Sequence, residues 1–131
     1  MRSVEFEQFL ERVFQELGYV VETTKVTGDQ GVDLIVAFRG RRIAVQVKGY
    51  FNSVSNGAVQ EAYAGMGYYN CDSCAVITNS RFTPSAVELS DKIRCVLVDE
   101  IRLPGIILGD LDLWSLCFNR NQLNRVSTVV E

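Results

Sequence analysis

The stretch from Gly28 to Tyr50, GDQGVDLIVAFRGRRIAVQVKGY, constrains the fold of this chain more than any other part of its sequence. Val32–Phe38 and Arg42–Tyr50 are rich in β-branched residues, and Arg39-Gly40 interrupts them. This pattern is typical of two strands joined by a tight turn. Three polar side chains break the apolar interior of the predicted hairpin: Asp33, Gln46 and Lys48.

A two-residue loop at Arg39-Gly40 would determine the register of the hairpin. Asp33 would then lie directly opposite Gln46, with Cβ atoms about 4.5–5.5 Å apart. Lys48 would share the face of Gln46, because side chains alternate along a strand. The other face would be uniformly apolar, formed by Leu34, Val36, Phe38, Ile43, Val45 and Val47. A one-residue slip would reverse both faces, so this consistency supports the register.

A carboxylate, an amide and an ammonium on one sheet face favour a functional site. Carboxylate and amide oxygens are the hard ligands that suit Mg²⁺. A lysine ammonium can stabilise charge that develops on a phosphate, or help to activate a water molecule. Taken singly, Asp33 could be an ordinary acid at a strand start, and Gln46 and Lys48 could be exposed sheet positions. Their combination, with Ala37 and Ala44 as small neighbours, favours a site.

GDQGVDL followed by VQVK resembles the Asp…Gln-x-Lys variant of the PD-(D/E)XK nuclease motif, as found in Mrr-like restriction endonuclease domains. The resemblance covers roughly residues 3–103. Its other matching segments are Phe6-Glu7, Gly18-Tyr19, Ala58-Val59-Gln60-Glu61, Ala75–Ser80 with Phe82-Thr83, and Val98-Asp99. Asp-x(12)-Gln-x-Lys alone is a weak pattern, and the ordered flanking segments make it more specific.

The resemblance implies a metal site and a catalytic lysine. Asp33 and the Gln46 carbonyl would bind Mg²⁺ or Mn²⁺, helped by the backbone carbonyl of Val47, while Lys48 would position or activate the attacking water. Glu7, on the first helix, would approach the same metal. Because glutamine replaces the usual acid, one negative ligand is lost and weaker metal affinity is expected.

Several further residues are candidates with ordinary structural alternatives. Glu7 could instead be a solvated helix acid, and Asp29 is a turn residue that would serve as a fallback carboxylate. The resemblance makes Gln60 a possible DNA contact or supporting residue near the catalytic strand; otherwise it is a surface amide. Asn79, Ser80 and Arg81 precede a helix capped by Thr83-Pro84, where they could seat a phosphate or only cap the helix.

Hydrophobic spacing predicts short strands alternating with helices. The expected helices are Ser3–Leu17, Ala58–Tyr69, Pro84–Ile93 and about Asp110–Arg125, and the remaining strands are Tyr19–Val26, Cys74–Ser80 and Cys95–Asp99. On the second helix we expect Val59, Ala62, Tyr63, Met66 and Tyr69 to face inward. Gln60 and Glu61 should point elsewhere. The fold class is therefore α/β, with a mixed central sheet, an antiparallel hairpin plus parallel strands, flanked by helices. The resemblance implies that this layout is a restriction-endonuclease-like core.

Length and composition limit the remaining interpretations. The 131 residues suffice for one folded core, and the absence of histidine excludes Ser-His-Asp triads and histidine-metal nucleases. A net charge of −3 argues mildly against a free-standing DNA binder. The acidic N-terminal segment lacks a signal-peptide core and no apolar run would span a membrane, so we expect a cytoplasmic protein with reduced thiols.

Two features stand outside this motif. Cys71, Cys74, Cys95 and Cys117 are read as structural thiols, with a four-cysteine zinc site and a redox pair as alternatives. Residues 104–131 form a C-terminal helical tail, which we expect to pack on the domain or on a partner. Residues 1–103 would be the Mrr-like catalytic domain.

The sequence therefore predicts a metal-dependent endonuclease of restriction type that hydrolyses phosphodiester bonds in double-stranded DNA. A DNA-binding or protein-interaction module with weak catalysis is one alternative, and a junction or repair nuclease acting on branched DNA is another. A homodimer through the tail and a separate DNA-recognition domain or subunit are expected partners. DNA sequence or methylation preference does not follow from the sequence.

Overall fold

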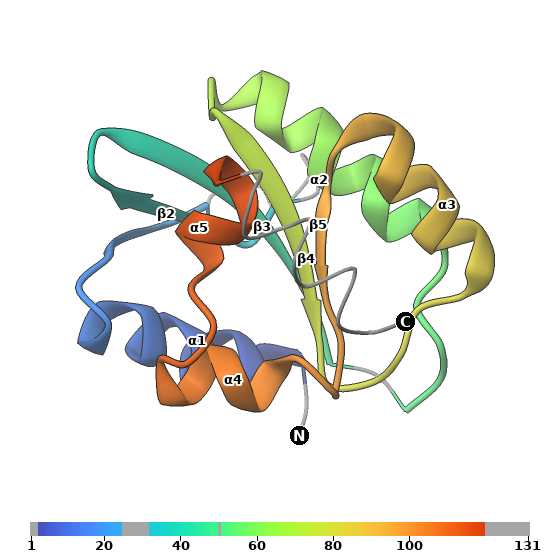
Figure 1. Cartoon of the computed structure of the whole chain (residues 1–131), viewed down its shortest axis with the longest axis horizontal. Helices are drawn as coiled ribbons and strands as arrows, with labels where there is room; N and C mark the ends of the chain where they lie inside the picture. The colour runs from blue at the N-terminus through green and yellow to red at the C-terminus, as the bar shows by residue number, and fades with distance from the viewer. Residues whose placement is uncertain (1–2, 25–31, 50, 120–131) are drawn as a thin grey trace.

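The computed structural model describes residues 3–24, 32–49 and 51–119. These residues form a five-stranded sheet in the spatial order β1-β2-β3-β4-β5, with helices on both faces (Figure 1). The elements are α1 (Ser3–Glu16), β1 (Val20–Thr23), β2 (Leu34–Phe38), β3 (Arg41–Lys48), α2 (Asn56–Tyr68), β4 (Ser73–Thr78), α3 (Pro84–Ile93), β5 (Val96–Val98), α4 (Leu103–Leu108) and α5 (Leu113–Phe118). The chain thus has the predicted α/β class.

The sheet is mixed, as the sequence predicts. β1, β2 and β3 pair antiparallel, whereas β4 pairs parallel with β3 and β5 pairs parallel with β4. β2 and β3 are joined by a two-residue turn, and each parallel connection carries one helix, α2 or α3. Because parallel strands need such a crossover, the carboxyl ends of β3, β4 and β5 meet at one edge of the sheet.

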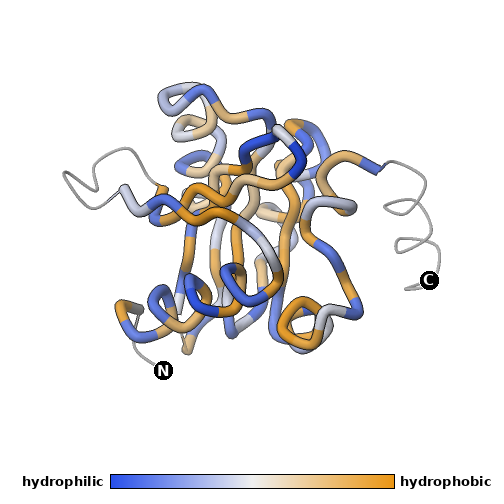
Figure 2. Tube along the Cα trace, turned by 90° about the vertical axis from the view of Figure 1, so that its left-hand side faces the viewer, coloured by the Kyte–Doolittle hydropathy of each residue, from blue (hydrophilic) through white to orange (hydrophobic). Residues whose placement is uncertain are grey.

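Each face of the sheet has its own hydrophobic cluster. Figure 1 shows the helices that cover the two faces, and Figure 2 shows the hydropathy of each residue along the chain. α1, α4 and α5 cover one face, where Phe6, Leu10 and Phe14 of α1 pack against alternate residues of β2, β3 and β4. α2 and α3 cover the other face through small residues such as Ala58, Ala62 and Ala86. Every residue of β4 is apolar or small because helices cover both faces of this strand.

The turn between β2 and β3 confirms the predicted register along β2. Phe38 pairs with Arg41, and Leu34 pairs with Val45. Arg39 and Gly40 have φ values of 52° and 76°, the pair of positive φ angles that a two-residue turn of this kind requires. The apolar residues of β2 and β3 on the predicted apolar face belong to the α1 cluster.

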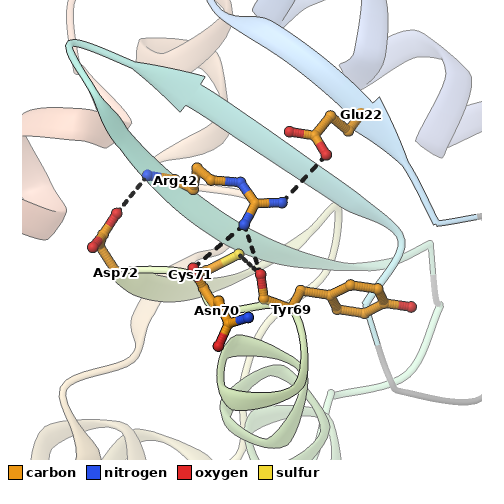
Figure 3. Close-up of polar contacts among 6 residues, drawn as sticks. All are labelled: Glu22, Arg42, Tyr69, Asn70, Cys71 and Asp72. Carbon is orange, nitrogen blue, oxygen red and sulfur yellow. Dashed lines mark hydrogen bonds and ion pairs between the residues drawn. The ribbon is translucent and has the colours of Figure 1, made fainter.

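Arg42 joins three segments that are distant in the sequence (Figure 3). Its guanidinium donates to Glu22 Oε1 on β1 at 3.2 Å, and to the carbonyl oxygen atoms of Tyr69 at 2.6 Å and Asn70 at 3.3 Å. Its backbone amide donates to Asp72 Oδ2 at 2.8 Å. These bonds hold the end of α2 against the start of β3, so the α2 crossover is anchored at the sheet end opposite Lys48.

Two helix predictions need correction. On α2, Ala58 and Gly65 are buried while Tyr63 is 47 % exposed, so the inward face is rotated from the predicted one toward its small residues. α4 was not predicted as a separate helix, because Pro104-Gly105 resembles a chain break; proline is tolerated in a first helical turn, where it stands here. No described helix is long and apolar enough to cross a membrane.

The predicted C-terminal helix is confirmed only over Leu113–Phe118, where α5 begins at the cap residue Asp112. The expected extension to Arg125 lies outside the described residues, as do Val26 and Asp29. Leu113 and Leu116 are buried in the α1 cluster. This part of the tail therefore packs on the sheet of its own chain.

Candidate active site

Asp33 stands one residue before β2, beside the carboxyl end of β3. Its amide donates to the Val45 carbonyl oxygen at 3.0 Å, although Leu34 is the residue paired with Val45. Asp33 therefore lies at the end of the ladder rather than in the regular pair with Gln46 that the turn geometry predicted. Its Oδ2 atom accepts from the Val47 amide at 2.8 Å. The side chain thus occupies the edge of β3 that β2 no longer covers.

This contact also brings the Val47 carbonyl to Asp33. In a strand, the amide and the carbonyl of one residue point toward the same neighbour. Since the Val47 amide points at Asp33 Oδ2, its carbonyl oxygen lies along the same edge. A carboxylate and a backbone carbonyl, two oxygen ligands of the kind that magnesium accepts, are therefore neighbours.

Gln46 and Lys48 lie on the face of β3 that α2 covers, opposite the face that packs against α1. Gln46 is 6 % exposed, and its Nε2 atom donates to Glu61 Oε1 at 3.3 Å. Lys48 Nζ forms an ion pair with the same Glu61 oxygen, also at 3.3 Å. The Gln46 Oε1 atom is buried and has no hydrogen-bond partner among the described residues. An unpaired buried carbonyl is costly unless a ligand satisfies it.

Glu61 is the site residue that the sequence reasoning missed. The predicted inward face of α2 directed Glu61 away from the sheet and gave the supporting role to its neighbour, Gln60. In the structure Gln60 is exposed, whereas Glu61 reaches both Gln46 and Lys48. The spacing of the small residues Ala58, Ala62 and Gly65 could have indicated this role. Glu61 lies three residues after Ala58 and four before Gly65, so it shares their side of the helix.

Glu7 of α1 lies against Asp33 from the opposite face of the sheet. The pKa of Glu7 is raised to about 7, mainly by burial and also by the Asp33 charge and a hydrogen bond with Asp33. Burial also raises the pKa of Asp33, against the lowering effects of the Val47 amide, Lys48 and Glu7. Two carboxyl groups that share a hydrogen bond favour retention of one proton between them.

The end of β4 and the segment that follows it form hydrogen bonds with the end of β3 and the loop after it. The Thr78 hydroxyl donates to the Lys48 carbonyl oxygen at 2.6 Å, and the buried Ser80 hydroxyl donates to the Asn52 carbonyl oxygen at 2.9 Å. Thr83 accepts from the Ala86 amide and so caps α3. The Ser80 hydroxyl therefore stabilises the loop after β3. Asn79 is half-buried, and Arg81 is exposed, 3.9 Å from Glu100.

The side chains of the candidate site do not include the cluster of acids that many metal sites use. Among the described residues, no three cysteine, aspartate or glutamate side chains gather to hold a metal ion. The arrangement instead offers one carboxylate, the unpaired Gln46 carbonyl and a backbone carbonyl, and these oxygen donors fit Mg²⁺ or Mn²⁺.

The four cysteines do not form the zinc site considered from the sequence. All four are free thiols, and Cys74 and Cys95 are buried in the sheet beside each other. No group of three such side chains able to hold a metal occurs in the part of the chain that the structure describes, which includes every cysteine. The environment of Cys74 and Cys95 is that of small apolar core residues, whereas Cys71 and Cys117 are partly exposed.

Comparison with family models identifies the family of the chain. The Mrr_cat family model, whose description is restriction endonuclease, matches residues 1–107 of the chain. Because the match spans most of the 131 residues, the chain belongs to this restriction endonuclease family. No curated protein sequence matches the chain significantly.

Three solved structures share the fold. The modification-dependent restriction endonuclease AspBHI is 15 % identical with a TM-score of 0.65 over 82 % of this chain, and MspJI in complex with a 27-mer oligonucleotide is 22 % identical with a TM-score of 0.51 over 96 %. The protein of unknown function AF1548 is 16 % identical with a TM-score of 0.61 over 71 %. At these identities the likeness establishes the fold alone, which is restriction-endonuclease-like. The chain spans 55 % of AF1548, 31 % of AspBHI and 32 % of MspJI, hence only part of each.

Proposed function

We propose that this chain is the catalytic domain of a divalent-metal-dependent endonuclease of restriction type, acting on double-stranded DNA. Its membership of a restriction endonuclease family supports the class of reaction. The observation that carries the metal assignment is the buried, unpaired Oε1 atom of Gln46, the residue before Val47, whose amide donates to Asp33. A bound cation would satisfy this buried oxygen, which otherwise lacks a hydrogen-bond partner among the described residues.

Three oxygen donors would hold the cation. They are the Asp33 carboxylate, the Oε1 atom of Gln46 and the backbone carbonyl of Val47. Bound Mg²⁺ or Mn²⁺ supplies positive charge that polarises a scissile phosphate. Glu7 lies next to Asp33, so its carboxylate is the nearest further acid on the α1 side. The set carries less negative charge than an all-carboxylate site, and we expect correspondingly weaker cation affinity.

Lys48 would act on the water or the phosphate rather than on the metal. It stands on β3, two residues from Gln46, with its side chain mostly buried and its ammonium held by Glu61. A positioned cation at this place can orient an attacking water or stabilise the charge that develops on the phosphate. The Thr78 hydroxyl restrains the Lys48 backbone, which keeps the ammonium in register with the cation ligands.

DNA recognition would come from a separate domain or subunit. The chain spans about a third of MspJI, whose structure contains a 27-mer oligonucleotide. A net charge of −3 gives the chain little general attraction for phosphates. We therefore expect the domain to depend on a partner for specificity and for much of its affinity.

A nicking and linearisation assay on supercoiled plasmid DNA tests this proposal. With Mg²⁺ or Mn²⁺ we expect cleavage that EDTA abolishes, that Asp33→Ala eliminates and that Lys48→Ala slows by about a hundredfold or more. Asp91→Ala and Lys92→Ala make the same changes on the exposed surface of α3 and should cleave like the wild type. Cleavage that survives both site substitutions contradicts the proposed mechanism.

The acidic charge balance favours one alternative, a binding module that retains the fold without efficient cleavage. Fluorescence anisotropy with a labelled duplex separates the two. Binding without cleavage under every metal condition supports the module, whereas cleavage that depends on Asp33 and Lys48 excludes it.

A further inference from the structure

Gln46 can offer an oxygen to a cation in only one orientation of its amide, whereas a glutamate could do so in either. A glutamate presents an oxygen at both ends of its terminal group, so either orientation offers an oxygen to a cation. A glutamine carries one carbonyl oxygen and one NH₂ group. If the amide of Gln46 turned over, it would direct two N–H donors at the cation position. Some neighbour must therefore select the orientation of the amide.

Glu61 has the position and chemistry for this selection. Its Oε1 atom lies 3.3 Å from Gln46 Nε2, and a carboxylate can only accept hydrogen bonds when it is ionised. The NH₂ end of Gln46 is therefore attracted to α2, and the Oε1 end is left on the other side, buried and without a partner among the described residues. The same Glu61 oxygen lies 3.3 Å from Lys48 Nζ, so one carboxylate oxygen contacts both side chains.

We propose that Glu61 is a positioning residue which orients the Gln46 amide so that its carbonyl oxygen faces the cation, and which holds the Lys48 ammonium in place. This inference rests on the proposed function. Glu61 contacts neither the cation nor the substrate directly, and acts through Gln46 and Lys48. A glutamine on β3 and an acid at this position of α2 thus form one functional unit.

The pairing also explains why glutamine suits this position. A glutamate at position 46 would bring two carboxylates within about hydrogen-bonding distance, and like charges that close are destabilising. With glutamine the contact becomes a favourable donor–acceptor pair. The loss of one negative ligand is thereby offset by an oxygen whose direction is controlled.

A double-mutant cycle on Mn²⁺ affinity tests the proposal without measuring activity. Mn²⁺ binding to the full chain is measured by calorimetry or electron paramagnetic resonance, in the absence of DNA. We expect Glu61→Ala to weaken binding by about tenfold or more, the usual size of effects from residues that orient metal ligands. Glu61→Gln keeps a carbonyl acceptor for Gln46 Nε2, so it should stay within about threefold of the wild type.

The second half of the cycle uses a Gln46→Glu background, in which both ends of the side chain carry oxygen. Orientation is then irrelevant, and Glu61→Ala should not weaken Mn²⁺ binding there. A simple loss of negative charge would weaken it equally in both backgrounds. Glu88→Gln and Glu88→Ala on exposed α3 control for the overall charge change. Thermal denaturation confirms folding, which half-exposed Glu61 should not perturb.

The outcomes separate the two proposals. Equal losses in both backgrounds, or no loss on Glu61→Ala, overturn the role of Glu61 and leave the metal site intact, provided that Asp33→Ala abolishes binding. A wild-type chain that binds no Mn²⁺ overturns the proposed function and the positioning role together.

Discussion

At the residue scale, the candidate site is a group of polar and charged side chains around the end of β3 that β2 does not cover. The identities of Asp33, Gln46 and Lys48 were readable from the sequence, because the alternation of a hairpin makes polar interruptions conspicuous. Glu61 was not, because its contact depends on the rotation of α2, which packs through small residues rather than through Tyr63. Glu7 was a candidate through the family resemblance, and its contact with Asp33 depends on how α1 packs against the sheet.

The Glu7–Asp33 pair predicts how stability depends on pH. The pKa of Glu7 rises from 4.5 to about 7 on folding, chiefly through burial. Within this window the folded chain retains a proton that the unfolded chain has released, so this contribution to stability falls as pH rises. In EDTA, Glu7→Gln should reduce the loss of stability between about pH 5 and pH 8, measured by urea denaturation.

The control for this pH experiment is Glu16→Gln, which removes an exposed acid from the same helix. It should follow the wild-type profile. A Glu7→Gln profile that parallels the wild type at every pH would show that the pair does not retain the proton.

At the element scale, Tyr19 connects the start of the sheet to α5. Its hydroxyl donates to Asp112 Oδ1 at 2.7 Å and accepts from the Trp114 amide at 2.9 Å. Asp112 Oδ2 in turn accepts from the Ser115 amide at 3.1 Å and caps α5. A short helix of this kind has little stability of its own, so these bonds determine where it docks. The sequence suggested a helix here without indicating that Tyr19 would hold it.

Tyr19→Phe should lower the free energy of unfolding by about 1–3 kcal/mol, because the Trp114 amide and the Asp112 carboxylate each lose a partner. Tyr68→Phe removes the same hydroxyl group from a side chain that is 62 % exposed, and should have almost no effect. Urea denaturation of both variants measures the difference. Equal effects would mean that the hydroxyl of Tyr19 does not anchor α5.

At the scale of the whole molecule, residues of α5 beyond the family match complete the α1 side of the core. The match ends at residue 107, whereas Leu113 and Leu116 are each 1 % exposed within the same cluster as Phe6 and Leu10. The division at residue 103 remains a prediction. Because the hydrophobic surface of β3 and β4 needs cover on both faces, the domain depends on this added helix.

Leu116→Ala should therefore destabilise the chain by about 2–5 kcal/mol, the range for a leucine truncated in a packed core. Leu108→Ala makes the same change at a side chain that is 73 % exposed, and should cost far less. Thermal or urea unfolding reports both. If the two variants are equally stable, α5 does not contribute to the core of the chain.

The sequence alone determined the hairpin and its register, since the alternation and a turn that accepts two positive φ angles are local properties. It also predicted that the last two strands run parallel, because a strand-helix-strand segment has few topologies open to it. Only the tertiary structure decided which helix residues reach β3. Glu7 and Glu61 approach from opposite faces through packing between distant segments, and a shift of one residue in either helix would exchange them for neighbours.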